Sequence, residues 1–238
     1  MALTNIILLS QITGHVVAFI LSMCIIVPMG LHVHSFGGHC LLFASGEWKE
    51  DGLFYAIWAS QSYCNYPIFV GVALFLVSSI QIYRLSVVMY RELEITFLGL
   101  FFDVLFGILL CVMTLISAIM ITLGFIEWCS DMTQRFPSCE TADGQNITSE
   151  AISTSGFYIE MGTAQFGAWS SFAVWVGLSV FALLKLINNH EMRNVKVSMY
   201  IERQRLMNED AYRSSLSDTP EQINQQQQQP HSSVPTNA

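Results

Sequence analysis

Four long apolar stretches, separated by polar segments, dominate the chain. The most apolar of them, from Ile95 to Ile126, holds 32 residues with one charge, Asp103, and 20 are Leu, Ile, Phe or Val. A membrane-spanning helix needs ~20 apolar residues to cross ~30 Å of hydrocarbon. These 20 residues contribute about −6 to −12 kcal/mol to insertion, which outweighs the roughly +2.5 to +3.5 kcal/mol that a central Asp costs. The stretch is therefore predicted to insert as a helix.

The same pattern predicts an all-α membrane protein, a four-helix transmembrane bundle within residues 1–190 that carries two disulfide-bearing extracellular or lumenal loops. The first stretch lacks the basic start and short core of a signal peptide, so we expect it to be retained. The expected spans are about 6–29, 66–84, 95–126 and 164–187, and the outer loops about 30–65 and 127–163.

Residues 191–238 are predicted to form a cytoplasmic tail. From about residue 214 the tail consists mainly of Ser, Pro, Asn and Gln, including the tract Gln225–Gln229. Such a composition buries too little apolar surface to offset the entropy of ordering. We therefore expect disorder from about residue 214.

Basic residues set the expected orientation. Eight of the ten Lys and Arg residues lie in the second connection or at and after the fourth span, and only Lys49 and Arg135 lie in the first and third connections. The positive-inside rule then places both termini in the cytoplasm and the two long loops outside or in the lumen. The net charge of −8 comes without a basic stripe, so nucleic acid is not an expected partner.

Cysteine and sequon positions agree with that orientation. Four cysteines and the sequon at Asn146 all fall in the two outer loops, on the oxidising side, where disulfides persist and N-glycosylation occurs. Four cysteines allow three pairings. We favour Cys40 with Cys64 and Cys129 with Cys139, each closing one loop, while pairing across the loops stays open.

Several local motifs resemble the transmembrane protein 179 family, in order and spacing over roughly residues 1–190. The resemblance implies a four-span membrane protein and implies no reaction, ligand or cofactor. The Gln-rich tail departs from it. The motifs are Phe36, Gly38, Cys40–Phe43, Gly46 and Trp48; Gly124-Phe125, Trp128-Cys129 and Ser138-Cys139-Glu140; and Phe157-Tyr158, Ala164–Gly167, Trp169, Ser171, Trp175 and Lys185.

Asp103 is the most informative single residue, because ionisable groups inside a span usually face protein or a water-filled cavity. Gly99, Asp103 and Gly107 share one helical stripe, and small residues there allow close approach of a neighbouring helix. His15 lies at a similar expected depth in the first span. We hypothesise a hydrogen bond between His15 and Asp103. A role in holding the helices together is favoured over a proton or cation relay, because one polar pair does not make a conduction path. The third possibility is that Asp103 lies near the membrane interface and reaches water.

Three weaker patterns favour structural interpretations. His32, His34, His39 and Cys40 match no zinc spacing, so no metal site is predicted. Four tryptophans are expected to be membrane-interface anchors: Trp48, Trp58, Trp128 and Trp169. Small residues spaced four apart in the fourth span indicate an internal packing face or dimerisation: Ala164 with Ala168, Gly167 with Ser171, and Ala173 with Gly177.

The sequence therefore predicts a non-enzymatic multi-pass protein of the plasma membrane or secretory pathway, an accessory, adhesion or trafficking component. Its expected surroundings are the lipid bilayer and unidentified protein partners, with a homo-oligomer left open and no cofactor. The alternative is an oligomeric channel or proton-coupled transporter that uses Asp103. Claudin-like membership is not expected, because Cys40 and Cys64 straddle Trp48 and Trp58, whereas the paired cysteines of claudins follow the tryptophan motif.

Overall fold

The computed structural model describes residues 2–50, 52–91, 97–145 and 154–226. The chain divides into two compact units, residues 1–186 and 187–238. Helices and strands follow in the order α1 (Ala2–Ser35), β1 (Cys40–Trp48), β2 (Phe54–Ala59), α2 (Ser62–Arg91), α3 (Phe97–Met132), η1 (Glu140–Ala142) and α4 (Phe157–Gln226).

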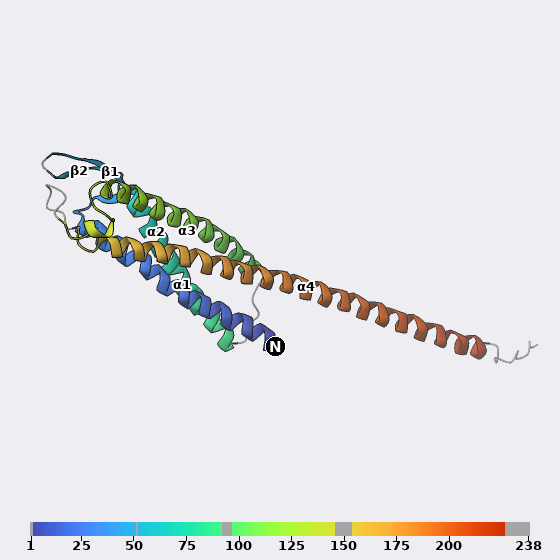
Figure 1. Ribbon diagram of the computed structural model, residues 1–238. Helices are drawn as coiled ribbons and strands as arrows, with labels where there is room; N and C mark the ends of the chain where they lie inside the picture. The colour runs from blue at the N-terminus through green and yellow to red at the C-terminus, as the bar shows by residue number, and fades with distance from the viewer. Residues whose placement is uncertain (1, 51, 92–96, 146–153, 227–238) are drawn as a thin grey trace, which may run out of the picture. The chain divides into compact units, whose positions relative to one another are not determined.

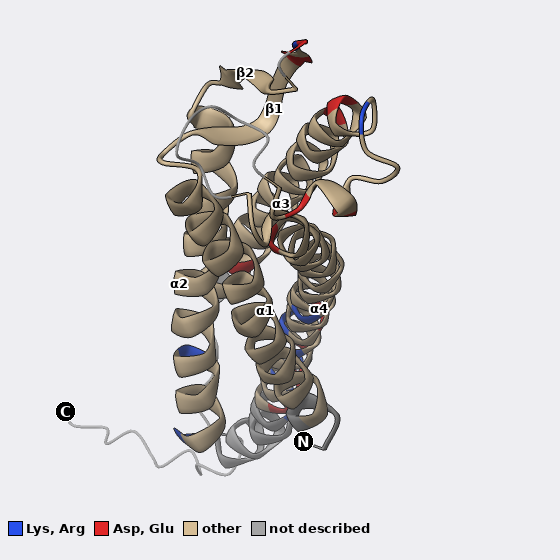
Figure 2. Ribbon diagram, turned by 60° about the vertical axis from the view of Figure 1, so that its left-hand side comes forward, with Lys and Arg blue, Asp and Glu red and all other residues tan. Residues whose placement is uncertain are grey.

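Within the first unit the four helices lie side by side, with the strands at one end (Figure 1). Each helix contains a stretch long and apolar enough to cross a membrane. The bodies of these helices are almost free of charged residues (Figure 2). The predicted four-helix membrane bundle is confirmed.

Glycines mark where neighbouring helices approach most closely. A Cβ added at Gly71 of α2 would lie 2.8 Å from Ile26 of α1. Gly107 of α3 would meet Ser179 of α4 at 2.8 Å, and Gly167 of α4 would meet Cys24 of α1 at 3.0 Å. Small residues at membrane helix interfaces permit this approach. Because lipid is as apolar as the helices, the hydrophobic effect does not drive them together, and van der Waals contact contributes instead.

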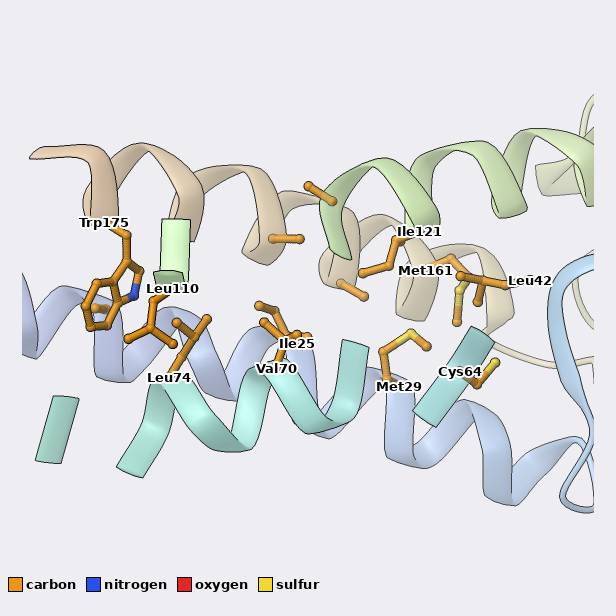
Figure 3. Close-up of a cluster of buried hydrophobic side chains, with 14 of the residues drawn as sticks. Ile25, Met29, Leu42, Cys64, Val70, Leu74, Leu110, Ile121, Met161 and Trp175 are labelled. Atoms are coloured by element: carbon orange, nitrogen blue, oxygen red, sulfur yellow. The ribbon is translucent and has the colours of Figure 1, made fainter. Parts of the chain in front are cut away.

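Apolar side chains fill the bundle along its length. Figure 3 shows Trp175, Leu110 and Leu74 at one end of this core, and Met161, Cys64 and Leu42 at the other. Val70, Ile25 and Ile121 lie between these groups. The middle of the bundle is therefore mainly apolar, with the buried hydroxyls of Ser22, Thr114, Ser117 and Ser171 among these side chains.

The strands were not expected. Residues 40–59 form a two-stranded antiparallel hairpin in what the sequence predicts as a loop. Ala44, Gly46 and Trp48 alternate with the exposed Ser45 and Glu47, which is the period of a strand with one buried face. The apolar run Leu41–Phe43 just before them hides this alternation.

We call the hairpin, the 3-10 helix η1 and the loops at this end of the bundle the cap. A second core lies under the hairpin. Trp128 is fully buried at its centre, with Phe36, Phe54 and Phe157 packed edge-on around it. The expectation that Trp128 is a membrane-interface anchor is wrong, because its indole fills the core that joins the cap to α3 and α4.

The second unit is the remainder of α4, and its side chains from Ile187 to Arg213 are almost all exposed. Helix continues to Gln226, whereas we expected disorder from about residue 214. Glu and Gln are good helix formers, so a segment too polar to pack can still extend a helix that has already begun.

Candidate functional site

Asp103 lies in a polar cluster at the end of the bundle away from the cap. Its Oδ1 accepts hydrogen bonds from Gln81 Nε2 at 2.8 Å and from Arg84 Nη1 at 2.8 Å. Arg84 Nη2 reaches Oδ2 at 3.4 Å, and Nη1 also donates to Gln81 Oε1 at 3.2 Å. The Arg84 and Asp103 side chains are 44% and 20% exposed, so water still reaches the ion pair.

A small cavity adjoins this cluster. Its volume is about 40 Å³, enough for about three water molecules at about 10–15 Å³ each. Lys185 of α4 lies on its wall and donates to Gln11 Oε1 of α1 at 3.4 Å. We call it the polar cavity, and its polar lining comprises Gln11, His15, Gln81, Asp103, Trp175, Ser179 and Lys185.

His15 lies in the polar cavity but makes no hydrogen bond with Asp103. Its ring packs edge-on against Trp175, with 5.7 Å between ring centroids, and its Nδ1 is buried without a hydrogen-bond partner. The predicted pairing is therefore wrong, although both side chains line one cavity. Arg84 was overlooked as a partner of Asp103; its place only 19 residues earlier in the chain could have revealed the contact.

Two disulfides, both among the described residues, confirm the favoured pairing. Cys40–Cys64 joins the start of β1 to the first turn of α2, and Cys129–Cys139 closes the segment after α3. Cys24 and Cys111 are free and lie within the helices. The cap is thus fixed covalently at two places.

The last turn of α3 supports the hairpin. Asp131 accepts a hydrogen bond from Gly46 N through Oδ2 and one from Trp48 Nε1 through its carbonyl oxygen, both at 3.0 Å. Arg135 Nη1 donates to Gly52 O at 2.8 Å, and its guanidinium lies 5.0 Å from the centre of the Trp48 ring. These contacts hold the hairpin against the bundle.

One face of the hairpin stays free of the core. Register pairs Ser45 with Ile57 and Glu47 with Tyr55, and all four side chains are exposed. Ile57 is 70% exposed, and Lys49 Nζ lies 3.6 Å above the Tyr55 ring. We call these five residues the outer hairpin face.

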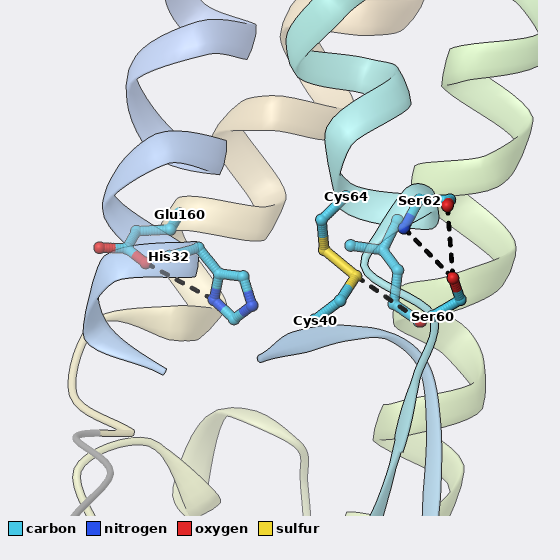
Figure 4. Close-up of a disulfide and its surroundings, with 7 residues drawn as sticks. His32, Cys40, Ser60, Ser62, Cys64 and Glu160 are labelled. Atoms are coloured by element: carbon cyan, nitrogen blue, oxygen red, sulfur yellow. Dashed lines mark hydrogen bonds and ion pairs between the residues drawn. A yellow bond between two sulfur atoms is a disulfide. The ribbon is translucent and has the colours of Figure 1, made fainter. Parts of the chain in front are cut away.

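His32 is completely buried where α1 meets the cap, near the Cys40–Cys64 disulfide (Figure 4). Its Nδ1 lies 3.9 Å from Glu160 Oε2 of α4, and its ring tilts against Phe36. Within the described ranges, no three His, Cys, Asp or Glu side chains gather as metal ligands. His32 and Glu160 thus form a polar contact between α1 and α4.

The small-residue pairs predicted in the fourth span differ in where they lie. The Ala164–Ala168 and Gly167–Ser171 pairs face the interior of the bundle, since Ala164, Ala168 and Ser171 are fully buried. The third pair, Ala173 with Gly177, lies on the outer surface of α4. Asn146 lies outside the described residues.

The fold and its cap define a class: a four-span membrane protein whose first connection is a disulfide-anchored hairpin. A family model described as the transmembrane protein 179/179B claudin domain matches residues 7–207. The chain belongs to this family. No solved structure matches it.

This membership corrects the exclusion of claudin-like proteins. The exclusion used one local feature, the order of cysteines and tryptophans in the first loop. The family match extends through all four helices and the cap, so one shifted disulfide does not decide membership.

Proposed function

We propose that the protein is non-enzymatic and acts by binding another protein through the outer hairpin face, as an accessory, adhesion or trafficking component. The observation that carries this proposal is the exposure of Ile57 and Tyr55 on a hairpin supported from below. Large apolar and aromatic side chains on a rigid surface with a polar rim are typical of binding hot spots. Glu47 and Lys49 supply that rim.

We also propose that both termini lie in the cytoplasm and that the cap lies outside or in the lumen, at the plasma membrane or in the secretory pathway. The basic residues near the end of α2 and those of α4 from Lys185 onward support this orientation. Both disulfides lie in the cap, which fits an oxidising compartment.

A channel or proton-coupled transporter is the less well supported alternative. Its best candidate, Asp103, is paired with Arg84 and Gln81, which favours a structural role. Mainly apolar side chains fill the bundle between the polar cavity and the cap (Figure 3), although the buried hydroxyls of Ser22, Thr114, Ser117 and Ser171 lie among them.

The experiment tests the outer hairpin face directly. A photo-crosslinking residue at Tyr55 should capture a cell-surface or secretory-pathway protein, and Ile57→Lys should abolish the crosslink. Gln134→Lys adds the same charge at an exposed position of the cap but off this face, so it should preserve the crosslink.

Equal loss with both variants, or no loss with Ile57→Lys, would refute the binding proposal. Flux through reconstituted vesicles that disappears with Asp103→Asn would establish the transporter instead. A tag after Ala238 should be accessible only after permeabilisation, and Asn146→Gln should remove a glycosidase-sensitive mass shift. Surface exposure of that tag would reverse the orientation.

A further inference from the structure

We propose that two copies of this chain pair through residues 191–213 of α4, beyond its membrane span, as a parallel two-stranded coiled coil. The proposal is independent of the role of the outer hairpin face. It depends on three properties of this segment, which we call the α4 extension: an apolar stripe with heptad spacing, charges that complement each other between two copies, and the shared orientation of copies in one bilayer.

An apolar stripe runs along the α4 extension. Met192, Val195, Met199 and Leu206 are each more than half exposed. Their spacings of three, four and seven residues place them on one helical face and match positions a, d, a and a of successive heptads. A helix draws most of its stability from packing such a face, so the stripe indicates a partner helix.

The charges beside the stripe fit a second copy of the same helix. In a parallel coiled coil, position g of one strand lies beside position e of the other, and charged residues there set partner and orientation. Glu191 occupies g, and Lys196 occupies the e position five residues later. Arg205 and Asp210 repeat this relation with the signs reversed. Two copies in register therefore bring together both opposite-charge pairs, each twice by symmetry.

Acidic residues interrupt the stripe at two later d positions, which Glu202 and Glu209 occupy. A d side chain packs into a hole on the other strand that includes its e position and its next a position. Arg203 therefore lies beside Glu202 of the other copy, and Arg213 beside Glu209. These arginines offset the repulsion between like charges, and polar residues in the seam fix the register at a cost in stability.

The bilayer favours pairing in this orientation. Copies inserted in the same direction have parallel α4 helices, and because α4 is one continuous helix, equivalent residues stand level with each other. Confinement to one bilayer also raises the effective concentration of the copies, so a short seam suffices. Binding of the stripe to the membrane surface is less favoured, since such helices carry mainly basic residues on the polar face, whereas both signs occur beside this stripe.

Cysteine crosslinking of the full chain in isolated membranes tests the pairing. On mild oxidation, Met199→Cys and Leu206→Cys should each give a disulfide-linked dimer, because equivalent a positions face each other across the seam. Val197→Cys is the matched control, exposed but on the opposite side of the helix, and should crosslink at least tenfold less. The unmodified chain gives the background from its two free cysteines, which lie within the helices of the bundle.

Charge reversal shows whether the partner is a second copy. With Met199→Cys as the reporter, Glu191→Lys or Lys196→Glu alone should lower the crosslinked fraction about two- to tenfold, because attractive pairs become repulsive. Differently tagged copies carrying one reversal each should crosslink with each other as well as the unreversed chain does. Gln204→Lys, at an exposed position on the far side of the helix, should change nothing. Glu202→Leu should increase crosslinking by completing the stripe.

Equal crosslinking at positions 197 and 199, or none at 199, would overturn the proposal. Single reversals that are not repaired when the two variants are mixed would also refute pairing in this register. A crosslink from Met199→Cys to a protein of different mass would assign the stripe to another partner. Protection of that cysteine from a water-soluble thiol reagent without any crosslink would place the stripe on the membrane surface, and both results refute pairing between copies.

Discussion

Asp103 allows a direct test of which side chain holds it, Arg84 or His15. The perturbations are Asp103→Asn, Arg84→Met and His15→Ala, singly and in the two double variants that contain Asp103→Asn. Each double variant closes a thermodynamic cycle whose coupling free energy isolates one pair.

The geometry sets the expected size of the coupling. The Arg84–Asp103 pair has an N–O distance of 2.8 Å, with side chains 44% and 20% exposed. Coulomb attraction at that separation, about 6 kcal/mol with an effective dielectric constant of ~20, is largely offset by desolvation and side-chain ordering. Exposed pairs retain about 0.2–1 kcal/mol, and removing one partner of a buried pair costs about 3–5 kcal/mol, so this half-buried pair should couple by about 1–2 kcal/mol.

The coupling between His15 and Asp103 should stay below about 0.5 kcal/mol, because the two side chains share no hydrogen bond. The assay is unfolding by SDS titration in mixed micelles, which gives a free energy of unfolding for each variant. Arg91→Met with Asp103→Asn is the matched control, since Arg91 is an exposed arginine of the same helix. Additive effects for Arg84 and Asp103, or a larger coupling with His15, would refute the assignment.

Three further predictions concern the cap and the helix contacts. Replacing Cys40 and Cys64 by Ser should lower the free energy of unfolding by about 3.5 kcal/mol, against about 2.8 kcal/mol for Cys129 and Cys139, because the first pair closes the longer loop; the reverse order in the same titration would contradict this. Gly124→Ala should lower the free energy of unfolding by about 1–3 kcal/mol, because its Cβ would lie 2.8 Å from Leu42. A Cβ at Gly162 meets nothing within 4 Å, so Gly162→Ala should be neutral or stabilising by up to about 1 kcal/mol. Equal effects of the two variants would show that the α3–β1 contact can shift to accept the methyl group. Arg135→Met should cost about 1 kcal/mol and increase proteolysis at residues 49–53, since it removes the bond to Gly52; unchanged cleavage would show that Asp131 suffices.

The sequence predicted the helices and the disulfides because each signal is local. Crossing hydrocarbon requires a long apolar run, as from Ile95 to Ile126, whatever the rest of the chain does. Cys129 and Cys139 are close in the chain, and Cys40 and Cys64 flank one loop, so closing each loop costs little conformational entropy of the chain. Both predictions therefore survived without knowledge of the packing.

The hairpin and the partner of Asp103 depend on contacts between distant segments. The inner face of the hairpin packs on Trp128, which lies more than 80 residues after Gly46 in the chain. Gly46 N also donates a hydrogen bond to Asp131, across a sequence separation of 85. Arg84 of α2 reaches Asp103 of α3, a contact that depends on how the two helices pack side by side. His15 was predicted as the partner of Asp103 from its similar depth in the membrane, and depth does not show which way a side chain points.

The Cys40–Cys64 disulfide lets the hairpin mature in two stages during synthesis. Both sulfur atoms belong to the first 64 residues, so this link can close before α3 has emerged from the ribosome. The Asp131 anchor comes 67 residues later (131 − 64), and only then can the hairpin settle on Trp128. A nascent chain that is cut off before Phe97 and halted behind a linker long enough to carry Cys64 out of the ribosome should therefore already be oxidised while its hairpin remains open to protease. If the halted chain still reacts with thiol reagents at Cys40, the link forms only after the bundle is complete.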